Sequence, residues 1–295
     1  MTIQFKKAER KRVKLRLAVT GVGGSGKTYS ALLLASGLGE KIAVIDSERE
    51  SAELYDDLVN FDVFSLSPPH SPRNYIEAID AAVAAKYDVL IVDSLSAAWN
   101  GEGGVLEMVD SLTQASTSKN SYMSWNKGTK EHNLLINKIL NCPLHIICTL
   151  RSKTAYELIE TGKGGKAPKK IGLAPIQRDG IDYEFSIVMD IAREGHLTTV
   201  SKDRTGQFIE REPFLITKQT GIEMKEWLLS GKEVPLLATI EQLQIIHQVL
   251  LGIGLKTPEK MLETVRNIIG RPINNSKELS HSEAILIIEN LETKN

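Results

Sequence analysis

Eight consecutive residues near the amino terminus have the types and the spacing needed to hold a polyphosphate. The run Gly21-Val22-Gly23-Gly24-Ser25-Gly26-Lys27-Thr28 fits the pattern G-x-x-x-x-G-K-[ST] at every fixed position. Its glycines permit tight backbone turns and leave the inward-facing amide groups open to anionic oxygen. In such a loop Lys27 reaches the β- and γ-phosphates, and the Thr28 hydroxyl ligates Mg²⁺. The sequence therefore predicts a nucleotide-phosphate site at residues 21–28.

The flanking residues have the pattern that such a loop needs. Residues 14–20 alternate like a strand and residues 29–39 have the apolar spacing of a helix, so the loop is expected between a strand and a helix. The apolar runs 41–46 and 87–93 are short and continuous, which is typical of strands buried on both faces of a parallel sheet. The second run ends in Asp93, which we expect to hold the water shell of the Mg²⁺.

The composition is that of an ordinary globular protein. Of 295 residues, 42% are hydrophobic and 25% charged, and the formal net charge is −1. Any nucleic-acid contact must then come from local basic patches rather than from overall charge. Cys142 and Cys148 have no histidine at metal-ligand spacing and are expected to be buried thiols in a reducing cytosol. We expect no membrane span and no signal peptide, and hence a cytoplasmic protein, in the host cell if a phage encodes it.

The middle of the chain has two segments that we expect to be loops. Residues 96–128 are rich in Gly, Ser, Thr and Asn, and a loop of that length is usually functional or mobile. Residues 151–178 are basic and carry several glycines, which favours a flexible track for a phosphate backbone. The lysines expected to contact DNA there are Lys163, Lys166, Lys169 and Lys170. An ordinary solvated loop is the alternative.

The remaining patterns define the domain organisation. Ser71-Pro72 predicts a helix start, and residues 184–192 and 196–201 predict two paired strands around Gly195. After a break near residues 230–232, Thr257-Pro258, Gly270 and the Ser280/Glu283 capping box mark helix ends. We therefore expect an α/β fold with a mostly parallel sheet and a small helical C-terminal module. The predicted parts are a basic arm at 1–13, a core at 14–232 and the module at 236–295.

These motifs, together with Ile147-Cys148-Thr149-Leu150-Arg151, resemble the core of the RecA-like recombinase and hexameric helicase ATPases over about residues 14–230. The nearest likeness is to phage-type RecA-like ATPases, classed with the AAA family, that act in single-strand annealing or recombination. The resemblance implies a P-loop ATPase core that uses ATP and Mg²⁺. The helical module resembles small appendages on phage recombination proteins more weakly, and we expect it to bind a protein partner.

The resemblance also implies roles for particular residues. Glu48 matches the acid that activates water for attack on the γ-phosphate, with Glu50 a less favoured substitute. Thr149 stands where the family often has a polar amide that senses the nucleotide, with Arg151 two residues on. Lys202 and Arg204 resemble cations inserted into the neighbouring subunit's nucleotide site, which implies a ring or filament. The segments 96–128 and 152–178 would face single-stranded DNA.

Several functions are compatible with these patterns. The first hypothesis is an ATPase that binds single-stranded DNA and promotes annealing or homologous recombination. Alternatives are a nucleotide-dependent regulatory switch that recruits a partner, and a ring helicase motor. A small-molecule kinase is disfavoured because no arginine-rich lid is evident. A GTPase is disfavoured because Asn126-Lys127 is not followed by Asp two residues later, nor Asp93 by Gly three residues later.

Overall fold

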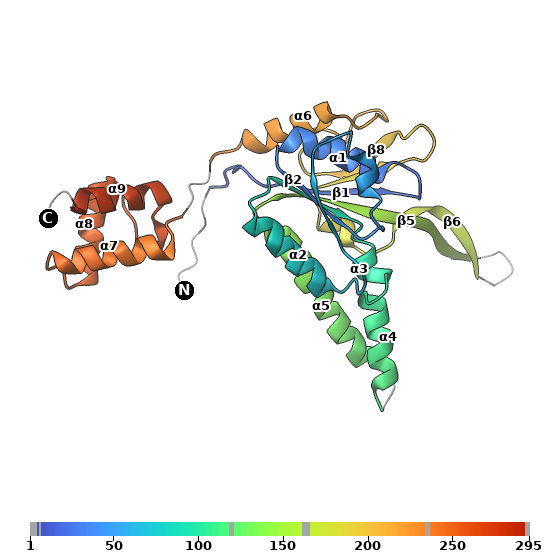
Figure 1. The fold of residues 1–295 in the computed structure, drawn as a ribbon, viewed down its shortest axis with the longest axis horizontal. Helices are drawn as coiled ribbons and strands as arrows, with labels where there is room; N and C mark the ends of the chain where they lie inside the picture. Colours follow the sequence, from blue (N-terminus) through green and yellow to red (C-terminus); the bar gives the residue numbers. More distant parts are fainter. Residues whose placement is uncertain (1–4, 6, 118–120, 161–165, 234–236, 293–295) are drawn as a thin grey trace. The chain divides into compact units, whose positions relative to one another are not determined.

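The computed structural model describes residues 5, 7–117, 121–160, 166–233 and 237–292. The chain divides into two compact units. Val13–Gly231 form the first, and Lys232–Asn295 together with Met1–Arg12 form the second. The first unit contains a central sheet with helices on both of its faces, and the second contains a small group of helices (Figure 1).

The central sheet is mostly parallel. Its strands follow the order β3-β2-β4-β5-β1-β7-β8, and β6 pairs with β5 outside this path. Only the pairs β7–β8 and β5–β6 are antiparallel among the described strands. The strand bounds are β1 Arg16–Gly21, β2 Ile42–Asp46, β3 Asp62–Ser65, β4 Val89–Asp93, β5 His145–Glu160, β6 Lys166–Pro175, β7 Ile187–Ile191 and β8 Thr198–Asp203. This arrangement confirms the predicted α/β fold.

Helices cover the sheet on both faces (Figure 1). The bounds of these helices are α1 Lys27–Leu38 and α6 Lys218–Leu229 on one face, and α2 Pro72–Ala84 and α5 Ser121–Asn141 on the other. Leu32 of α1 packs in the same buried cluster as Ile91 of the sheet. Ile79 of α2 belongs with Leu90 to the cluster on the opposite face. Adjacent residues of β4 thus point to different cores, which is why that strand has no polar side.

Local sequence signals placed several elements correctly. The predicted strand, loop and helix around the phosphate-loop sequence are β1 and α1, and the two buried apolar runs are β2 and β4. The Ser71 side chain caps α2 by accepting a hydrogen bond from the Asn74 amide at 3.3 Å, with Pro72 in the first turn. The paired strands expected around Gly195 are the antiparallel β7 and β8.

The expectation of a loop over 96–128 was wrong. The segment contains α3 (Ala97–Asn100), α4 (Val105–Ala115) and the beginning of α5. Val105 and Val109, four residues apart, are buried on the face of α4 that meets α5. A Cβ at Gly128 of α5 would lie 2.4 Å from Val109 Cγ2, so this glycine allows the two helices to approach closely. Gly128 thus serves helix packing, whereas Gly101, Gly103 and Gly104 form the short turn between α3 and α4.

The expectation of a loop over 151–178 was also wrong for the described residues. β5 continues beyond the sheet core and pairs antiparallel with β6, with Ser152 opposite Pro175 and Glu160 opposite Lys166. The two strands form a hairpin that projects from the sheet (Figure 1). The glycines and charged residues had hidden the strand signal, and the bulge between Ala155 and Tyr156 further interrupts the alternation.

The second unit is a small helical group with its own core. Its helices are α7 (Ile240–Gly252), α8 (Pro258–Ile269) and α9 (His281–Glu292), with a short 3-10 turn at Ser276–Glu278. Gly270 ends α8 in a left-handed conformation, and Ser280 and Glu283 exchange hydrogen bonds at 2.8 and 3.2 Å as a capping box. Among the described residues, no helix has both the length and the apolar character required to cross a bilayer.

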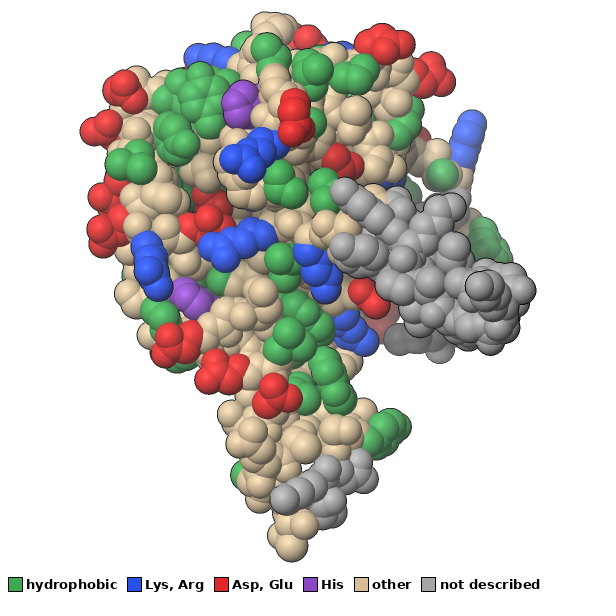
Figure 2. Space-filling model, turned by 90° about the vertical axis from the view of Figure 1, so that its right-hand side faces the viewer, with side chains coloured by type: hydrophobic (Ala, Val, Ile, Leu, Met, Phe, Trp, Pro, Cys, Tyr) green, Lys and Arg blue, Asp and Glu red, His purple; other side chains and the backbone are tan. Residues whose placement is uncertain are grey.

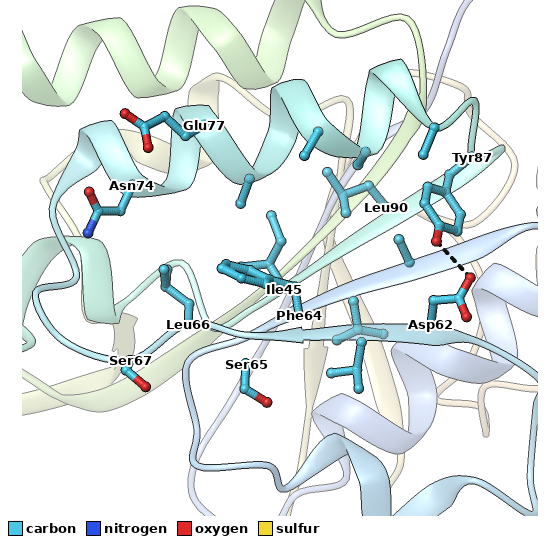
Figure 3. Close-up of a pocket in the computed structure, with 17 residues that line it drawn as sticks. Ile45, Asp62, Phe64, Ser65, Leu66, Ser67, Asn74, Glu77, Tyr87 and Leu90 are labelled. Atoms are coloured by element: carbon cyan, nitrogen blue, oxygen red, sulfur yellow. Dashed lines mark hydrogen bonds between the residues drawn. The ribbon is translucent and has the colours of Figure 1, made fainter.

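A cavity of about 710 Å³ lies between β3 and α2 (Figure 3). Ile45, Phe64 and Leu90 contribute to its largely apolar wall, and the Tyr87 hydroxyl donates to Asp62 Oδ2 at 2.6 Å at one end. The phosphate-loop residues do not line this cavity. The chemistry predicted from the sequence therefore has to be found elsewhere, at the carboxyl ends of the parallel strands, where ligands of open α/β sheets bind.

Candidate nucleotide-binding site

The phosphate-loop sequence forms the connection between β1 and α1. β1 ends at Gly21, which lies in register between Arg151 of β5 and Ile191 of β7. Gly24 and Gly26 have φ angles of 76° and 89°, which glycine adopts without the clash that a Cβ would cause. Gly26 is the N-cap residue of α1, so the positive end of the helix dipole faces the loop. The backbone here has the form that anion binding requires.

The Lys27 side chain folds back over the loop. Its Nζ donates to the Val22 carbonyl at 3.0 Å, and the side chain is largely buried. Burial lowers the pKa of Lys27 below its ordinary value, against the opposing effect of the Glu48 and Asp93 carboxylates. Its present partner is a single backbone carbonyl, so a phosphate oxygen could replace that partner without disrupting a wider network.

Asp93, the last residue of β4, is held between two hydroxyl groups. Its Oδ2 accepts a hydrogen bond from Thr28 Oγ1 at 2.6 Å, and its Oδ1 accepts one from the Thr149 hydroxyl. Burial raises the pKa of Asp93 to about 6, although both hydrogen bonds act in the opposite direction. Thr149 itself is fully buried and stands behind the carboxylate, so its hydroxyl orients Asp93.

These oxygen atoms fit a magnesium ion. A buried carboxylate with a raised pKa is stabilised by a nearby divalent cation, because the cation offsets the lost solvation of the negative charge. Thr28 and Asp93 would hold the ion, which prefers oxygen ligands and keeps several waters. In the part of the chain that the structure describes, no group of three or more His, Cys, Asp or Glu side chains forms a metal site. The remaining ligands would be water and phosphate oxygens.

Glu48 is fixed beside Asp93 by the loop that follows β2. β2 and β4 are neighbours, with Asp46 opposite Asp93. Asp46 is buried and accepts hydrogen bonds from the Glu48 amide at 2.5 Å and the Ala52 amide at 2.9 Å, so its carboxylate organises the loop. The Glu48 side chain forms an ion pair with Arg151, with Oε1 and Nε 2.8 Å apart.

The ion pair decides the charge of Glu48. Burial by itself raises the pKa of Glu48, but the hydrogen bond and the positive charge of Arg151 outweigh this, and the net pKa lies below its usual value. Glu48 is therefore ionised at neutral pH, as a general base must be. The same ion pair also ties the carboxylate to β5, because Arg151 is the residue opposite Gly21 in the sheet.

Lys202 and Arg204 do not reach the phosphate loop of their own chain. Lys202 Nζ donates to the Asp182 and Tyr183 carbonyls, both at 2.7 Å, and Arg204 donates to the Tyr183 carbonyl at 3.0 Å. Lys202 of β8 lies opposite Val188 of β7, and Val188 is three residues before Ile191, the partner of Gly21. At about 3.3 Å per residue, the backbone of Lys202 therefore lies roughly 10 Å from the level of Gly21 along the strand direction.

Three of the four lysines predicted to contact DNA lie in the β5–β6 hairpin. Lys166, Lys169 and Lys170 are in β6, opposite Glu160, Glu157 and Tyr156 of β5. Lys163 lies outside the described residues. Figure 2 faces the side of the molecule from which the hairpin projects, and it shows Lys and Arg side chains across the middle of that face with acidic side chains around them.

The sequence did not reveal three residues of this region. Asp46 ends a buried strand as Asp93 does, and that shared signal could have identified it. Arg193 and His196 belong to the turn between β7 and β8, and nothing in their local sequence indicates that the turn lies against the phosphate loop. Only the sheet order, which puts β7 next to β1, brings them there.

Two comparisons with known proteins bear on this site. No curated protein matches the chain. A family model described as an AAA domain matches residues 13–215, which covers β1 to β8, the phosphate loop, Glu48 and Asp93. That match includes well over half of the chain, and it agrees with the parallel sheet and the loop geometry. The chain therefore belongs to this AAA domain family and has a P-loop ATPase-type fold.

Proposed function

We propose that this AAA-domain protein hydrolyses ATP with Mg²⁺ and couples hydrolysis to binding of single-stranded DNA, in annealing or homologous recombination. The observation that carries the proposal is the convergence of Lys27, Thr28, Asp93 and Glu48 at the carboxyl edge of one parallel sheet. In this proposal Lys27 is the phosphate-binding cation, Thr28 and Asp93 are the magnesium ligands, and Glu48 is the ionised carboxylate. Phosphoryl transfer from a nucleoside triphosphate needs this set of groups.

Each group has a role that follows from its chemistry. Lys27 and the loop amides would bind the phosphates, and Thr28 with Asp93 would hold Mg²⁺. The ion, when bound, neutralises charge on the phosphate oxygens. Glu48 would orient a water molecule and accept its proton, once its carboxylate is turned from Arg151 toward the γ-phosphate.

The DNA part of the proposal is supported by the hairpin. Arg151, the partner of Glu48, is in β5, the strand that continues into the lysine-bearing hairpin. A strand of DNA bound on the hairpin would thus contact the same element that holds the catalytic carboxylate. In an assembly of several copies, Lys202 and Arg204 would serve a neighbour's site, and the helical unit at 236–295 would bind a protein partner.

The proposal is tested by the rate of ATP hydrolysis with and without single-stranded DNA, over a range of protein concentrations. We expect DNA to raise the rate, and the rate per chain to rise with concentration if the active site is shared. The variant with Lys163, Lys166, Lys169 and Lys170 all changed to Ala should bind DNA more weakly and with a smaller salt dependence. Unchanged DNA affinity in this variant would contradict the assignment of the hairpin.

A regulatory nucleotide switch is a second candidate, and the Glu48–Arg151 ion pair favours it. A carboxylate held by an arginine at 2.8 Å is not free to activate water. If no ligand breaks this pair, the protein binds ATP and turns it over slowly. Tight ATP binding with no hydrolysis, in the presence or absence of DNA, would support the switch over the motor.

A further inference from the structure

The turn that joins β7 to β8 lies against the phosphate loop of the same chain. It is closed by a hydrogen bond from the Ala192 amide to the Leu197 carbonyl at 2.9 Å. Gly195 and His196 both have positive φ angles, 67° and 54°. A residue other than glycine adopts this conformation uncommonly, and such residues concentrate where a structure is constrained for function.

His196 contacts the backbone of the phosphate loop directly. Its Nδ1 is 3.0 Å from the Ser25 carbonyl oxygen. Because a carbonyl only accepts hydrogen bonds, Nδ1 carries the proton in this contact. A Cβ added to Gly26 would lie 3.4 Å from the same nitrogen. The imidazole is therefore packed against the last two residues of the loop before Lys27 and limits how the loop can move.

Arg193, at the start of the turn, brings a guanidinium group to the loop. Its Nε lies 4.0 Å from the position that a Cβ on Gly24 would occupy. Within the described part of the chain, no carboxylate forms a salt bridge with Arg193. Arg151, another cation near the site, is already paired with Glu48. Arg193 is thus a cation with no carboxylate partner beside a loop shaped for anions.

We infer that Arg193 binds the phosphates of the nucleotide held by its own chain's loop, and that His196 is a positioning residue that fixes the loop through the Ser25 carbonyl. The inference rests on the proposed nucleotide site. A nucleoside triphosphate carries several negative charges, of which Lys27 and a magnesium ion offset only part. The guanidinium matches phosphate oxygens in geometry and can donate two parallel hydrogen bonds. This assignment differs from that of Lys202 and Arg204, which would act on a neighbouring chain.

The test is the affinity of the full chain for ATP and for ADP with Mg²⁺, measured by titration calorimetry. Arg193→Ala should weaken ATP binding by about tenfold or more, as expected for loss of a charge-assisted hydrogen bond. Arg193→Lys should recover part of the loss. Because the contact is within one chain, the loss should be the same at protein concentrations too low for assembly.

Lys218→Ala is the matched control, since it removes one exposed positive charge at the first residue of α6, which packs beside the far end of α1. The Lys218 carbonyl lies against Gly37, ten residues beyond Lys27. At 1.5 Å per residue this is about 15 Å from the loop. ATP affinity should be unchanged in this variant, so a loss confined to Arg193 variants cannot come from net charge alone.

His196→Gly separates positioning from general stability. Glycine tolerates the positive φ, so the turn keeps its shape while the bond to Ser25 is lost. We expect affinity for both ATP and ADP to fall by about three- to tenfold, with the melting temperature of the nucleotide-free protein unchanged. A lowered melting temperature with normal affinity would show a merely structural histidine and overturn its role.

The outcomes also separate this inference from the proposed function. If Lys27→Ala abolishes ATP binding while Arg193→Ala binds as tightly as the wild type, the inference is wrong and the nucleotide site stands. If the wild-type protein binds neither nucleotide, both are wrong.

Discussion

The two ends of the strands β1 and β5 both bury polar side chains, but they use them differently. At the amino end, Arg16 donates to the Leu144 carbonyl at 2.8 Å and to three other backbone carbonyls, and His145 Nδ1 accepts from the Leu15 amide at 3.1 Å. At the carboxyl end, several polar side chains bond to one another, as in the largely buried Thr28–Asp93 contact and the more exposed Arg151–Glu48 ion pair, and Lys27 bonds to a single loop carbonyl.

The difference shows which buried polar groups are able to do chemistry. A side chain bonded to backbone carbonyls of strands and helix ends cannot change partner without unfolding its surroundings. A side chain bonded to another side chain, or to a single loop carbonyl, can exchange that partner for a ligand. We therefore assign the amino end to stability and the carboxyl end to nucleotide chemistry, and the following changes test that division.

Lys27→Ala should have the largest effect on activity. It removes the cation that reaches the phosphates, so we expect ATP hydrolysis to fall by about 10²- to 10³-fold. Stability should change little, because Lys27 makes one hydrogen bond to a loop carbonyl. Phosphate release and thermal melting measure the two effects. If the folded variant still hydrolysed ATP at the wild-type rate, Lys27 and the loop at the carboxyl end of the strands would not be the site of hydrolysis.

Glu48→Gln tests whether that carboxylate is the base. Hydrolysis should fall by about 10²- to 10⁴-fold, because an amide cannot accept the proton of water. ATP binding should persist, since Glu48 does not hold the phosphates. The control is Glu50→Gln in the same loop, which should hydrolyse ATP normally. If the Glu50 variant lost activity instead, the base would have to be reassigned.

Arg16→Met tests the structural end. The variant removes the Arg16 donor from the buried carbonyls of Cys142 and Leu144, and we expect a loss of about 2–4 kcal/mol in the free energy of unfolding. Urea denaturation measures this loss. The hydrolysis rate per folded molecule should be that of the wild type. If Arg16→Met hydrolysed ATP more slowly than the wild type but unfolded at the same urea concentration, the amino end could not be assigned to stability alone.

His145 gives the smallest effect, and it depends on pH. Burial lowers the pKa of His145 to about 4, so the folded protein keeps the imidazole neutral while the unfolded chain takes up a proton near pH 6.5. Stability should therefore be complete above about pH 6.5 and fall toward pH 4, by on the order of 2–3 kcal/mol.

His145→Asn is the matched variant for this effect. The Asn Oδ1 can accept the Leu15 amide hydrogen bond but does not titrate in this range. Urea denaturation at several pH values should show a shallower loss of stability in the variant than in the wild type. Identical pH profiles would mean that His145 is not the group responsible.

The sequence predicted which residues lie at the carboxyl end of the strands better than it predicted the contacts between them. The phosphate loop and Asp93 could be recognised because each depends on a short stretch of residues. The Glu48–Arg151 ion pair joins residues 103 positions apart, and no local pattern indicates it. Thr149 was expected to sense the nucleotide. Its hydrogen bond to Asp93 could not be predicted, because it depends on β4 and β5 being neighbours in the sheet.

Secondary structure was predicted wrongly where the residue composition suggested a loop but tertiary packing stabilises a helix or a strand. The glycines and serines of 96–128 suggested a loop, although Val105 and Val109 have helical spacing and bury against α5. β3 was not predicted because it has four residues, three of them exposed, at the edge of the sheet. The capping signals of α8 and α9 succeeded because helix ends are specified by neighbouring residues.

The central claim is that a triphosphate binds the loop at residues 21–28 with its terminal phosphorus facing Glu48. A crystal structure with Mg²⁺ and a non-hydrolysable ATP analogue measures this most directly. The account predicts the phosphates against the loop amides and Lys27, Mg²⁺ at Thr28, and the Glu48 carboxylate one water molecule from the γ-phosphorus. An analogue bound elsewhere, or a Glu48 carboxylate pointing away from the phosphates, would contradict it.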